Sequence, residues 1–137
     1  ARRELEERFS LPGWVEPETV IEEFGKSDLL FMPSRSEGLP MVGVQALSMG
    51  LAIVASDIGG FLDLVDDREN GYLVKPEDEK SFVNSLREFI KEPEKLLTFR
   101  QASYQKAKTF DINFIADQYE EVFLKIKNER TTHQSVK

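Results

Sequence analysis

Three short apolar runs, each bounded by turn-forming residues, most constrain how this chain can fold. They span residues 28–32, 52–55 and 72–74. Continuous apolar runs of this length are typical of strands that are buried on both faces of a sheet. Helical patterns separate them, at residues 40–49 and 61–65. Because strands that alternate with helices indicate βαβ units, we expect an α/β fold built on a parallel sheet.

Helical patterns also occupy most of the remaining chain. Pro17, Asp78 and Pro93 stand where helices commonly begin, each followed by apolar residues at helical spacing. We expect these helices at residues 17–24, 78–90, 93–110 and 112–126. A further helix is expected at residues 1–8 and a short strand at residues 9–11. From Asp78 onward the chain is therefore predicted to be wholly helical.

Length and charge limit the number of domains and the classes of partner. The 137 residues suit one domain, which we expect at residues 1–128, followed by a disordered polar tail at residues 129–137. The net charge of −7 argues against a nucleic-acid partner, since phosphate neutralisation needs a basic surface. It also provides no attraction toward anionic lipids.

The cysteine and histidine content excludes several kinds of site. The chain has no cysteine, which excludes disulfides and thiolate metal sites and fits a reducing cytoplasmic location. The one histidine, His133, lies in the expected tail, where we predict that it is solvated. A single histidine cannot form a histidine-based metal cluster, and the acidic residues show no metal-ligand spacing. We therefore expect no bound metal.

Two loops are expected to meet at the carboxyl ends of the strands, where open parallel sheets bind ligands. They are residues 33–40 and 56–60, and each leads directly into a helix. A helix N-terminus offers unpaired N–H groups and a partial positive charge, which suits a phosphate. Gly38, Gly59 and Gly60 would let the backbone approach a ligand closely.

Glu37 does not suit a pure phosphate site, because its carboxylate would repel an anion. It would accept hydrogen bonds from neutral hydroxyls, so the combination indicates a ligand with a phosphate beside a polyol, such as a nucleotide sugar. Gln45 could reach a second hydroxyl-bearing group from the next turns of the helix. Two alternatives stay open: Glu37 as a carboxylate that only satisfies the N–H groups of the helix start, and Gly59-Gly60 as a simple turn.

The stretch from Pro33 to Leu47, PSRSEGLPMVGVQAL, resembles the signature of the retaining family 4 glycosyltransferases, also called glycosyl transferases group 1. The similarity continues through residues 49–60 and through Asn70-Gly71-Tyr72-Leu73-Val74 and Pro76, and it covers most of residues 9–125. It implies the GT-B arrangement of two Rossmann-like domains that face a cleft. This chain would then be part of the C-terminal, donor-binding domain, a three-layer α/β unit whose first strands lie upstream of Ala1.

The resemblance also implies roles for single residues. Glu37 matches the first Glu of the family's Glu-x7-Glu pattern, the candidate catalytic residue that holds hydroxyls of the donor sugar. The second Glu, which binds the ribose, corresponds here to Gln45, a departure that costs a charge-assisted hydrogen bond. The diphosphate or sugar would meet backbone N–H groups of Gly38, Leu39, Met41 and Val42, with Gly59 and Gly60 opposite.

Three further candidates lie outside these positions. Trp14 and Val15 match the segment that brackets the base in the family, with core packing as the alternative for Trp14. Arg35 is a candidate for the diphosphate, with a solvated loop arginine as the alternative. The family's other phosphate-binding cations and its acceptor domain are absent from this chain, so we expect the chain alone to be inactive.

Three hypotheses on function follow. The first is the donor-binding part of a retaining glycosyltransferase, with a nucleotide sugar as its ligand and no cofactor. The second is a non-catalytic nucleotide-sugar-binding module, which Gln45 favours. The third is a phospho-receiver domain with Asp57 as phosphoacceptor, although no acidic pair follows an earlier strand.

The apolar stripe on residues 112–126 would support either core packing or, if exposed, self-association.

Overall fold

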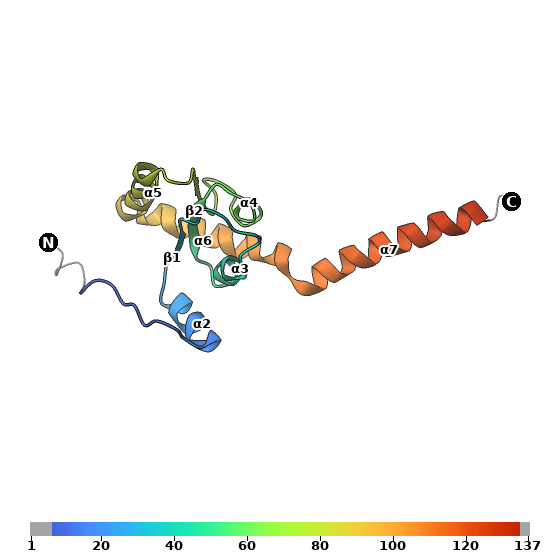
Figure 1. The fold of residues 1–137 in the computed structure, drawn as a ribbon, viewed down its shortest axis with the longest axis horizontal. Helices are drawn as coiled ribbons and strands as arrows, with labels where there is room; N and C mark the ends of the chain where they lie inside the picture. Colours follow the sequence, from blue (N-terminus) through green and yellow to red (C-terminus); the bar gives the residue numbers. More distant parts are fainter. Residues whose placement is uncertain (1–6, 135–137) are drawn as a thin grey trace.

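The fold is a three-stranded parallel sheet with helices on both faces. The computed structural model describes residues 7–134, with side chains up to Lys127. Strands β1 (Leu29–Met32), β2 (Ala52–Ser56) and β3 (Gly71–Val74) pair in the order β1-β2-β3. The helical elements are α2 (Pro17–Gly25), α3 (Met41–Ser48), α4 (Phe61–Leu64), α5 (Glu79–Lys91), α6 (Pro93–Ala107), the 3₁₀ turn η1 (Lys108–Phe110) and α7 (Ile112–Gln134). All three predicted apolar strands are confirmed (Figure 1).

The sheet lies between two apolar layers, which confirms the predicted three-layer α/β fold. All five residues of the central strand β2 are buried, as expected for a strand covered on both sides. On one face, Leu47, Phe61 and Leu64 from α3 and α4 form the core. On the other face the core is formed by aromatic residues of α5 and α6, namely Phe82, Phe89 and Phe99.

Helix α6 closes the edge of the sheet at which the strands begin. The Arg100 Nε donates to the carbonyl of Gly50 at 2.9 Å, and its guanidinium also pairs with Asp28. The Ser103 hydroxyl donates to the carbonyl of Asn70 at 3.3 Å. Since these three partners lie just before β2, β1 and β3, the helix spans all three strand starts. The opposite edge, where the strands end, carries the two loops predicted to bind a ligand.

One local prediction is also confirmed, and the structure explains a glycine within a helix. Asp78 caps α5, because its carboxylate accepts from the Ser81 N–H at 3.1 Å and from the Ser81 hydroxyl at 2.7 Å. The hydrogen bond from the Ser81 hydroxyl and then that from its N–H lower the pKa of Asp78. Gly43 is buried inside α3, where a Cβ would collide with the Leu64 side chain of α4. Close packing of α4 therefore accounts for a glycine within a helix.

The ends of the chain differ from expectation. Phe9–Leu11 form no strand, since no neighbouring strand supplies the hydrogen-bond partners, and most of the helix expected at residues 1–8 lies outside the described residues. Helix α7 continues to Gln134, although residues 129–137 were predicted as a disordered tail. No glycine or proline stops the helix after Asn128, which explains its continuation through 129–134. The domain boundary at residue 128 stays a prediction, and residues 135–137 lie outside the described part.

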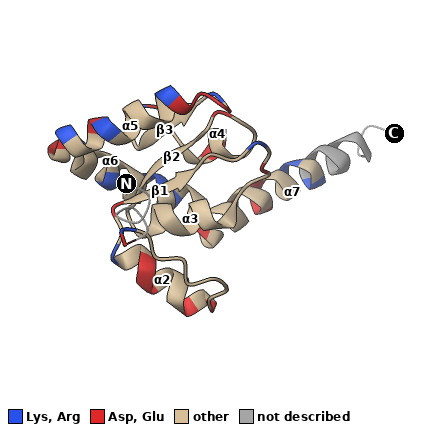
Figure 2. Ribbon diagram, turned by 60° about the vertical axis from the view of Figure 1, so that its left-hand side comes forward, with Lys and Arg blue, Asp and Glu red and all other residues tan. Residues whose placement is uncertain are grey.

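Helix α7 projects away from the sheet and its helical layers (Figures 1 and 2). Asp111 begins it, with the Asn113 and Phe114 N–H groups donating to its carboxylate at 2.9 and 3.3 Å. Despite its length, neither α7 nor any other helix within the described residues is apolar enough over a sufficient length to cross a membrane.

Candidate functional site

The two predicted loops meet at the carboxyl ends of β1 and β2 through direct backbone contact. A Cβ on Gly59, whose φ is +41°, would lie 2.5 Å from the carbonyl oxygen of Glu37. A Cβ on Gly60 would collide with the carbonyl of Gly38 and lie 2.6 Å from the Cα of Leu39. Only glycine permits this approach, so Gly59-Gly60 is more than a turn: it seats one loop against the other.

A row of unpaired backbone donors lies along the first of these loops. The N–H groups of Gly38, Leu39, Met41 and Val42 have no acceptor within the described residues. Helix α3 begins at Met41, and no side chain caps its start. A Cβ on Gly38 would meet no atom within 4 Å, so the space beside it is open. Unpaired N–H groups at a helix start, beside open space, form a site for an anion.

Glu37 adds a carboxylate to this row. Its side chain is half-buried, and its Oε1 accepts a hydrogen bond from the Ser34 hydroxyl at 3.2 Å. No backbone N–H of the helix start donates to the Glu37 carboxylate within the described residues, so a capping role for Glu37 finds no hydrogen bond in its support. Ser34 was not predicted as part of the site; the three-residue spacing of two polar side chains in one loop is the only signal that pointed to it. The remaining carboxylate lone pairs can accept from ligand hydroxyls.

The apolar and amide candidates lie on the same loop and helix. Leu39, Met41 and Gln45 are exposed, and Val42 is half-buried. Met41 and Gln45 stand one helical turn apart, as their spacing predicted. The Gln45 amide is therefore open to a ligand that approaches the start of α3.

The remaining candidates are placed differently. Trp14 precedes α2 with 93% of its surface exposed, so the alternative that it packs in a core is wrong for this chain. Val15 beside it is half-buried, and no hydrogen bond or ring contact of the described residues joins either of them to the two loops. Arg35 is exposed and forms an ion pair with Glu77, in the loop after β3, at 3.2 Å. That pair holds the guanidinium beside the ends of the strands.

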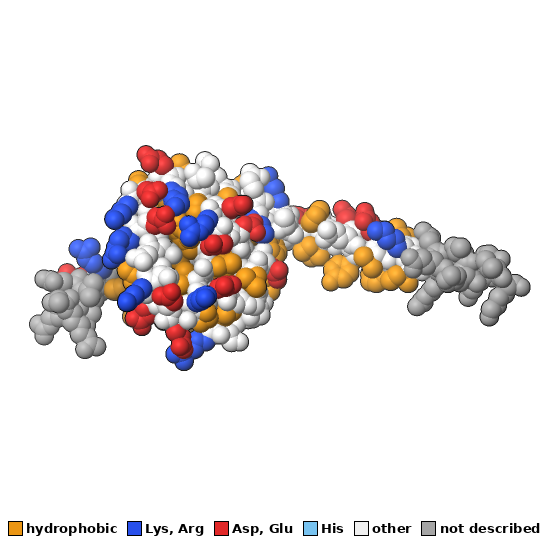
Figure 3. Space-filling view, turned by 90° about the horizontal axis from the view of Figure 1, so that it is seen from above, with side chains coloured by type: hydrophobic (Ala, Val, Ile, Leu, Met, Phe, Trp, Pro, Cys, Tyr) orange, Lys and Arg blue, Asp and Glu red, His pale blue; other side chains and the backbone are white. Residues whose placement is uncertain are grey.

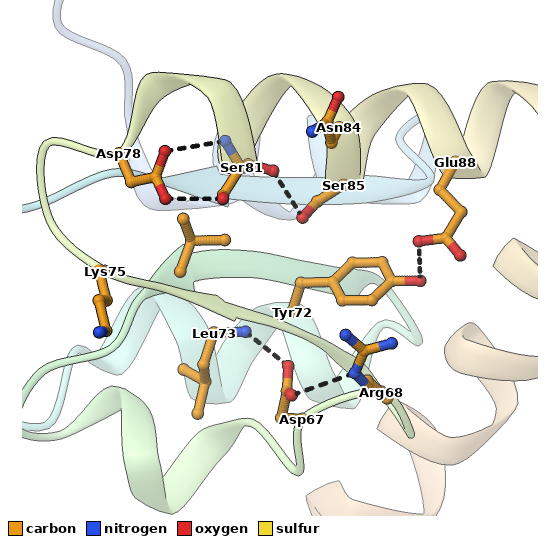
Figure 4. A pocket seen from close by; sticks show the side chains of 11 residues that line it. Asp67, Arg68, Tyr72, Leu73, Lys75, Asp78, Ser81, Asn84, Ser85 and Glu88 are labelled. Atoms are coloured by element: carbon orange, nitrogen blue, oxygen red, sulfur yellow. Dashed lines mark hydrogen bonds and ion pairs between the residues drawn. The ribbon is translucent and has the colours of Figure 1, made fainter.

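A separate pocket of about 430 Å³ lies between β3 and α5 (Figure 4). Several of its polar groups are hydrogen-bonded. The Tyr72 hydroxyl donates to Glu88 at 2.7 Å, and the Lys95 ammonium contacts the same carboxylate at 2.5 Å. The hydrogen bond from Lys95 and then that from Tyr72 lower the pKa of Glu88, while burial raises the pKa of Tyr72. This pairing links β3, α5 and α6 through side chains.

The receiver hypothesis finds no support in the acidic residues. Asp57 follows β2 and is exposed, with its N–H bound to the Val74 carbonyl at 2.7 Å. Across residues 7–127, no three His, Asp or Glu side chains gather in a way that could hold a metal ion. A phospho-receiver needs such a cluster for Mg²⁺.

Comparisons with known proteins indicate the family of the chain. The family model for glycosyl transferases group 1 matches residues 1–106. The D-inositol 3-phosphate glycosyltransferase of Rhodococcus jostii is 27% identical over 101 residues, covering 74% of this chain and 22% of that protein. The sulfoquinovosyl transferase SQD2 of Arabidopsis thaliana is 28% identical over 118 residues, covering 80% and 23%.

The fold also matches solved structures. The Anabaena protein HepE, crystallised in complex with UDP-glucose, superposes with a TM-score of 0.69 at 26% identity, covering 77% of this chain and 30% of that one. The sucrose-phosphate synthase of Thermosynechococcus elongatus shares the fold with a TM-score of 0.72 at 21% identity, covering 85% of this chain and 30% of that one. The chain thus spans less than a third of each of these proteins. With the family model matched over most of its length, the chain belongs to the glycosyl transferases group 1.

Proposed function

We propose that this chain is the donor-binding part of a retaining glycosyltransferase of the hexosyltransferase type. The complete protein would transfer a sugar from a nucleoside diphosphate to a glycan, lipid or small-molecule acceptor. The observation that carries this proposal is the row of unpaired N–H groups from Gly38 to Val42, next to the Glu37 carboxylate. One part suits a diphosphate and the other suits sugar hydroxyls.

Each candidate residue has a role in this proposal. The N–H groups of Gly38, Leu39, Met41 and Val42 bind the diphosphate and stabilise the negative charge that develops on it as the sugar departs. Glu37, held by Ser34, accepts from sugar hydroxyls. Gln45 binds the ribose, Arg35 assists at the diphosphate, and Trp14 and Val15 bracket the base. The proposed reaction uses no cofactor and no metal.

The rest of the catalytic machinery is proposed to lie in other parts of a longer protein. An acceptor domain and further phosphate-binding cations would complete the cleft, and the chain alone would bind donor without turning it over. The coverage of only 22–30% of the relatives supports this division. We propose a cytoplasmic location for the complete protein, which includes a peripheral position at a membrane.

A non-catalytic nucleotide-sugar-binding module is the second candidate. Gln45 favours it, because an amide binds a ribose hydroxyl less strongly than a carboxylate does. Sugar transfer by the longer protein distinguishes the two: sustained turnover supports the enzyme, and tight donor binding without turnover supports the module.

Binding to a matched pair of variants tests the site itself. The chain has a single tryptophan, Trp14, whose exposure makes it a fluorescence reporter for UDP, GDP and ADP and their glucose conjugates. We expect Glu37→Ala to weaken the nucleotide sugar about tenfold, a loss of about 1.4 kcal/mol, with little effect on the nucleoside diphosphate alone. Glu69→Ala removes an exposed carboxylate at the opposite edge of the sheet and serves as the control. Equal losses from both variants, or no binding to either protein, would contradict the proposal.

A further inference from the structure

One ion pair joins the loops that follow the two outer strands of the sheet. The Arg35 Nη2, in the loop after β1, lies 3.2 Å from the Glu77 Oε1, in the loop after β3. Because β2 separates these strands, and neighbouring strands lie about 4.8 Å apart, the two side chains reach toward each other across the end of β2. The pair therefore lies at the edge of the sheet from which the two ligand loops emerge.

The fold itself gains little from this ion pair. Both side chains are exposed, Arg35 by 83% and Glu77 by 70%, and an ion pair in water contributes little to stability. Glu77 also has a φ of +67°, in the left-handed region that glycine adopts freely and that strains a glutamate. Its carbonyl accepts from the Glu79 N–H at 3.1 Å, a contact that needs no carboxylate. Within the described residues, Arg35 is the one partner of the Glu77 side chain, so the role of this carboxylate lies in that contact.

Arg35 stands beside the proposed diphosphate site. It precedes Glu37 by two residues and precedes Gly38, the first donor of the N–H row, by three. The chain has a net charge of −7, and Figure 3 shows acidic and basic side chains interspersed over the part of the molecule that holds the sheet. An anionic ligand is therefore attracted by single cations near the site rather than by a field of one sign. While Glu77 is bound to Arg35, the charge of this cation is largely neutralised.

We propose that Glu77 competes with the donor diphosphate for the Arg35 guanidinium, so that the ion pair is a latch that the donor opens. This inference rests on the proposed function. A diphosphate carries more charge than one carboxylate and can accept two parallel hydrogen bonds from a guanidinium, so it displaces Glu77. Glu77 thereby lowers the affinity for the donor without touching it, and its side chain is released when the donor binds.

Calorimetric titration of the full 137-residue chain with UDP, GDP and ADP tests the latch. Glu77→Gln keeps the size of the side chain and removes its charge, so it should tighten the preferred nucleotide about threefold. Glu79→Gln is the matched control and should bind like the wild type, because Glu79 is also exposed but has no ion pair within the described residues. Arg35→Gln should weaken binding about tenfold, and in that background Glu77→Gln should have little further effect.

The outcomes separate the latch from the proposed function. If nucleotides bind but Glu77→Gln leaves their affinity unchanged or lowers it, the latch is overturned and the donor site stands. A gain that persists in full beside Arg35→Gln would also overturn the latch, since Glu77 would then act by direct repulsion. If no nucleotide binds to any of these proteins, the latch and the proposed function are both wrong. Chemical denaturation should give Glu77→Gln the stability of the wild type, and a clear loss would assign the ion pair to the fold instead.

Discussion

The two edges of the sheet are built in opposite ways. At the edge where the strands begin, α6 supplies side chains that bind the backbone: Arg100 binds Gly50 and Asp28, and Ser103 binds Asn70. At the edge where they end, the N–H groups of Gly38, Leu39, Met41 and Val42 are left without an acceptor in the described residues. One edge is satisfied within the chain, and the other is open to a ligand.

This difference separates stabilising groups from binding groups within one fold. The pocket between β3 and α5 has a volume of about 430 Å³, yet its Tyr72 and Glu88 pair with each other, and Glu88 also pairs with Lys95 of α6. Buried polar groups that are already paired stabilise the fold, while donors that are held rigidly without partners are available to a ligand. Whether polar groups already have hydrogen-bond partners, rather than how large a pocket is, therefore identifies the binding edge of this domain.

We expect the largest effect from Gly60→Ala, which disrupts the contact between the two loops at the open edge. The added Cβ collides with the backbone at Gly38 and must push the two loops apart, which we expect to cost about 2–3 kcal/mol of stability and to abolish nucleotide binding. Gly38→Ala is the control, since its Cβ has open space and the fold should remain as stable as the wild type. Chemical denaturation of both variants checks this, and equal stability of Gly60→Ala and wild type would refute the loop contact.

Arg100→Ala should destabilise the edge at which the strands begin without affecting the edge that is open to a ligand. It removes the hydrogen bond to the Gly50 carbonyl and the pair with Asp28, and we expect a loss of about 2 kcal/mol in the free energy of unfolding. Nucleotide affinity of the folded protein should stay unchanged. Arg87→Ala, on the exposed side of α5, should have almost no effect on stability. A binding defect in Arg100→Ala with normal stability would show that the two edges are not separate.

Glu88→Gln tests the paired pocket through its dependence on pH. The pKa of Glu88 is lowered in the folded protein, so its contribution is present above the ordinary Glu pKa and is lost as the pH falls through the folded pKa. We expect the variant to lose about 1 kcal/mol at neutral pH, a modest value because the pair is partly solvated, and to show a flatter acid limb. Thermal melts from pH 3 to pH 7 measure this. Identical pH profiles for the two proteins would exclude a stabilising role for the Glu88 pair.

The smallest effect concerns Gln45 on the open edge. Gln45→Glu restores a carboxylate at the ribose position, and we expect nucleotide binding to tighten by about 1 kcal/mol, roughly fivefold. Titration by Trp14 fluorescence measures the change, with Ser48→Glu on the same helix as a control for added charge. Weaker binding of Gln45→Glu than of Ser48→Glu would mean that Gln45 does not face a hydroxyl.

Much of the architecture was predictable from the sequence because its signals are local. The apolar runs at 28–32 and 52–55 became β1 and β2, and Asp78 began α5, since burial and capping act over a few residues. The strand expected at residues 9–11 failed because a strand needs a neighbour, which a local pattern does not reveal. The end of α7 was missed because no stop signal follows Asn128.

The site was predictable in its chemistry but not in its contacts. The helix start after residues 33–40 predicted unpaired N–H groups, and the structure has them. That Gly60 packs on the backbone of Gly38, or that Ser34 binds Glu37, depends on how two loops fold together in space. Spacing along the sequence does not contain that information.

The most direct test follows the backbone amides of the whole ¹⁵N-labelled chain by NMR during titration with UDP-glucose, GDP-glucose and ADP-glucose. We expect one donor to shift the amide resonances of Gly38, Leu39, Met41 and Val42 most. The resonances of residues bonded to α6, such as Gly50, should stay in place. The proposed donor site would be contradicted if saturating concentrations of all three donors shifted no amide resonance in this row. It would also be contradicted if they shifted only resonances around the β3–α5 pocket.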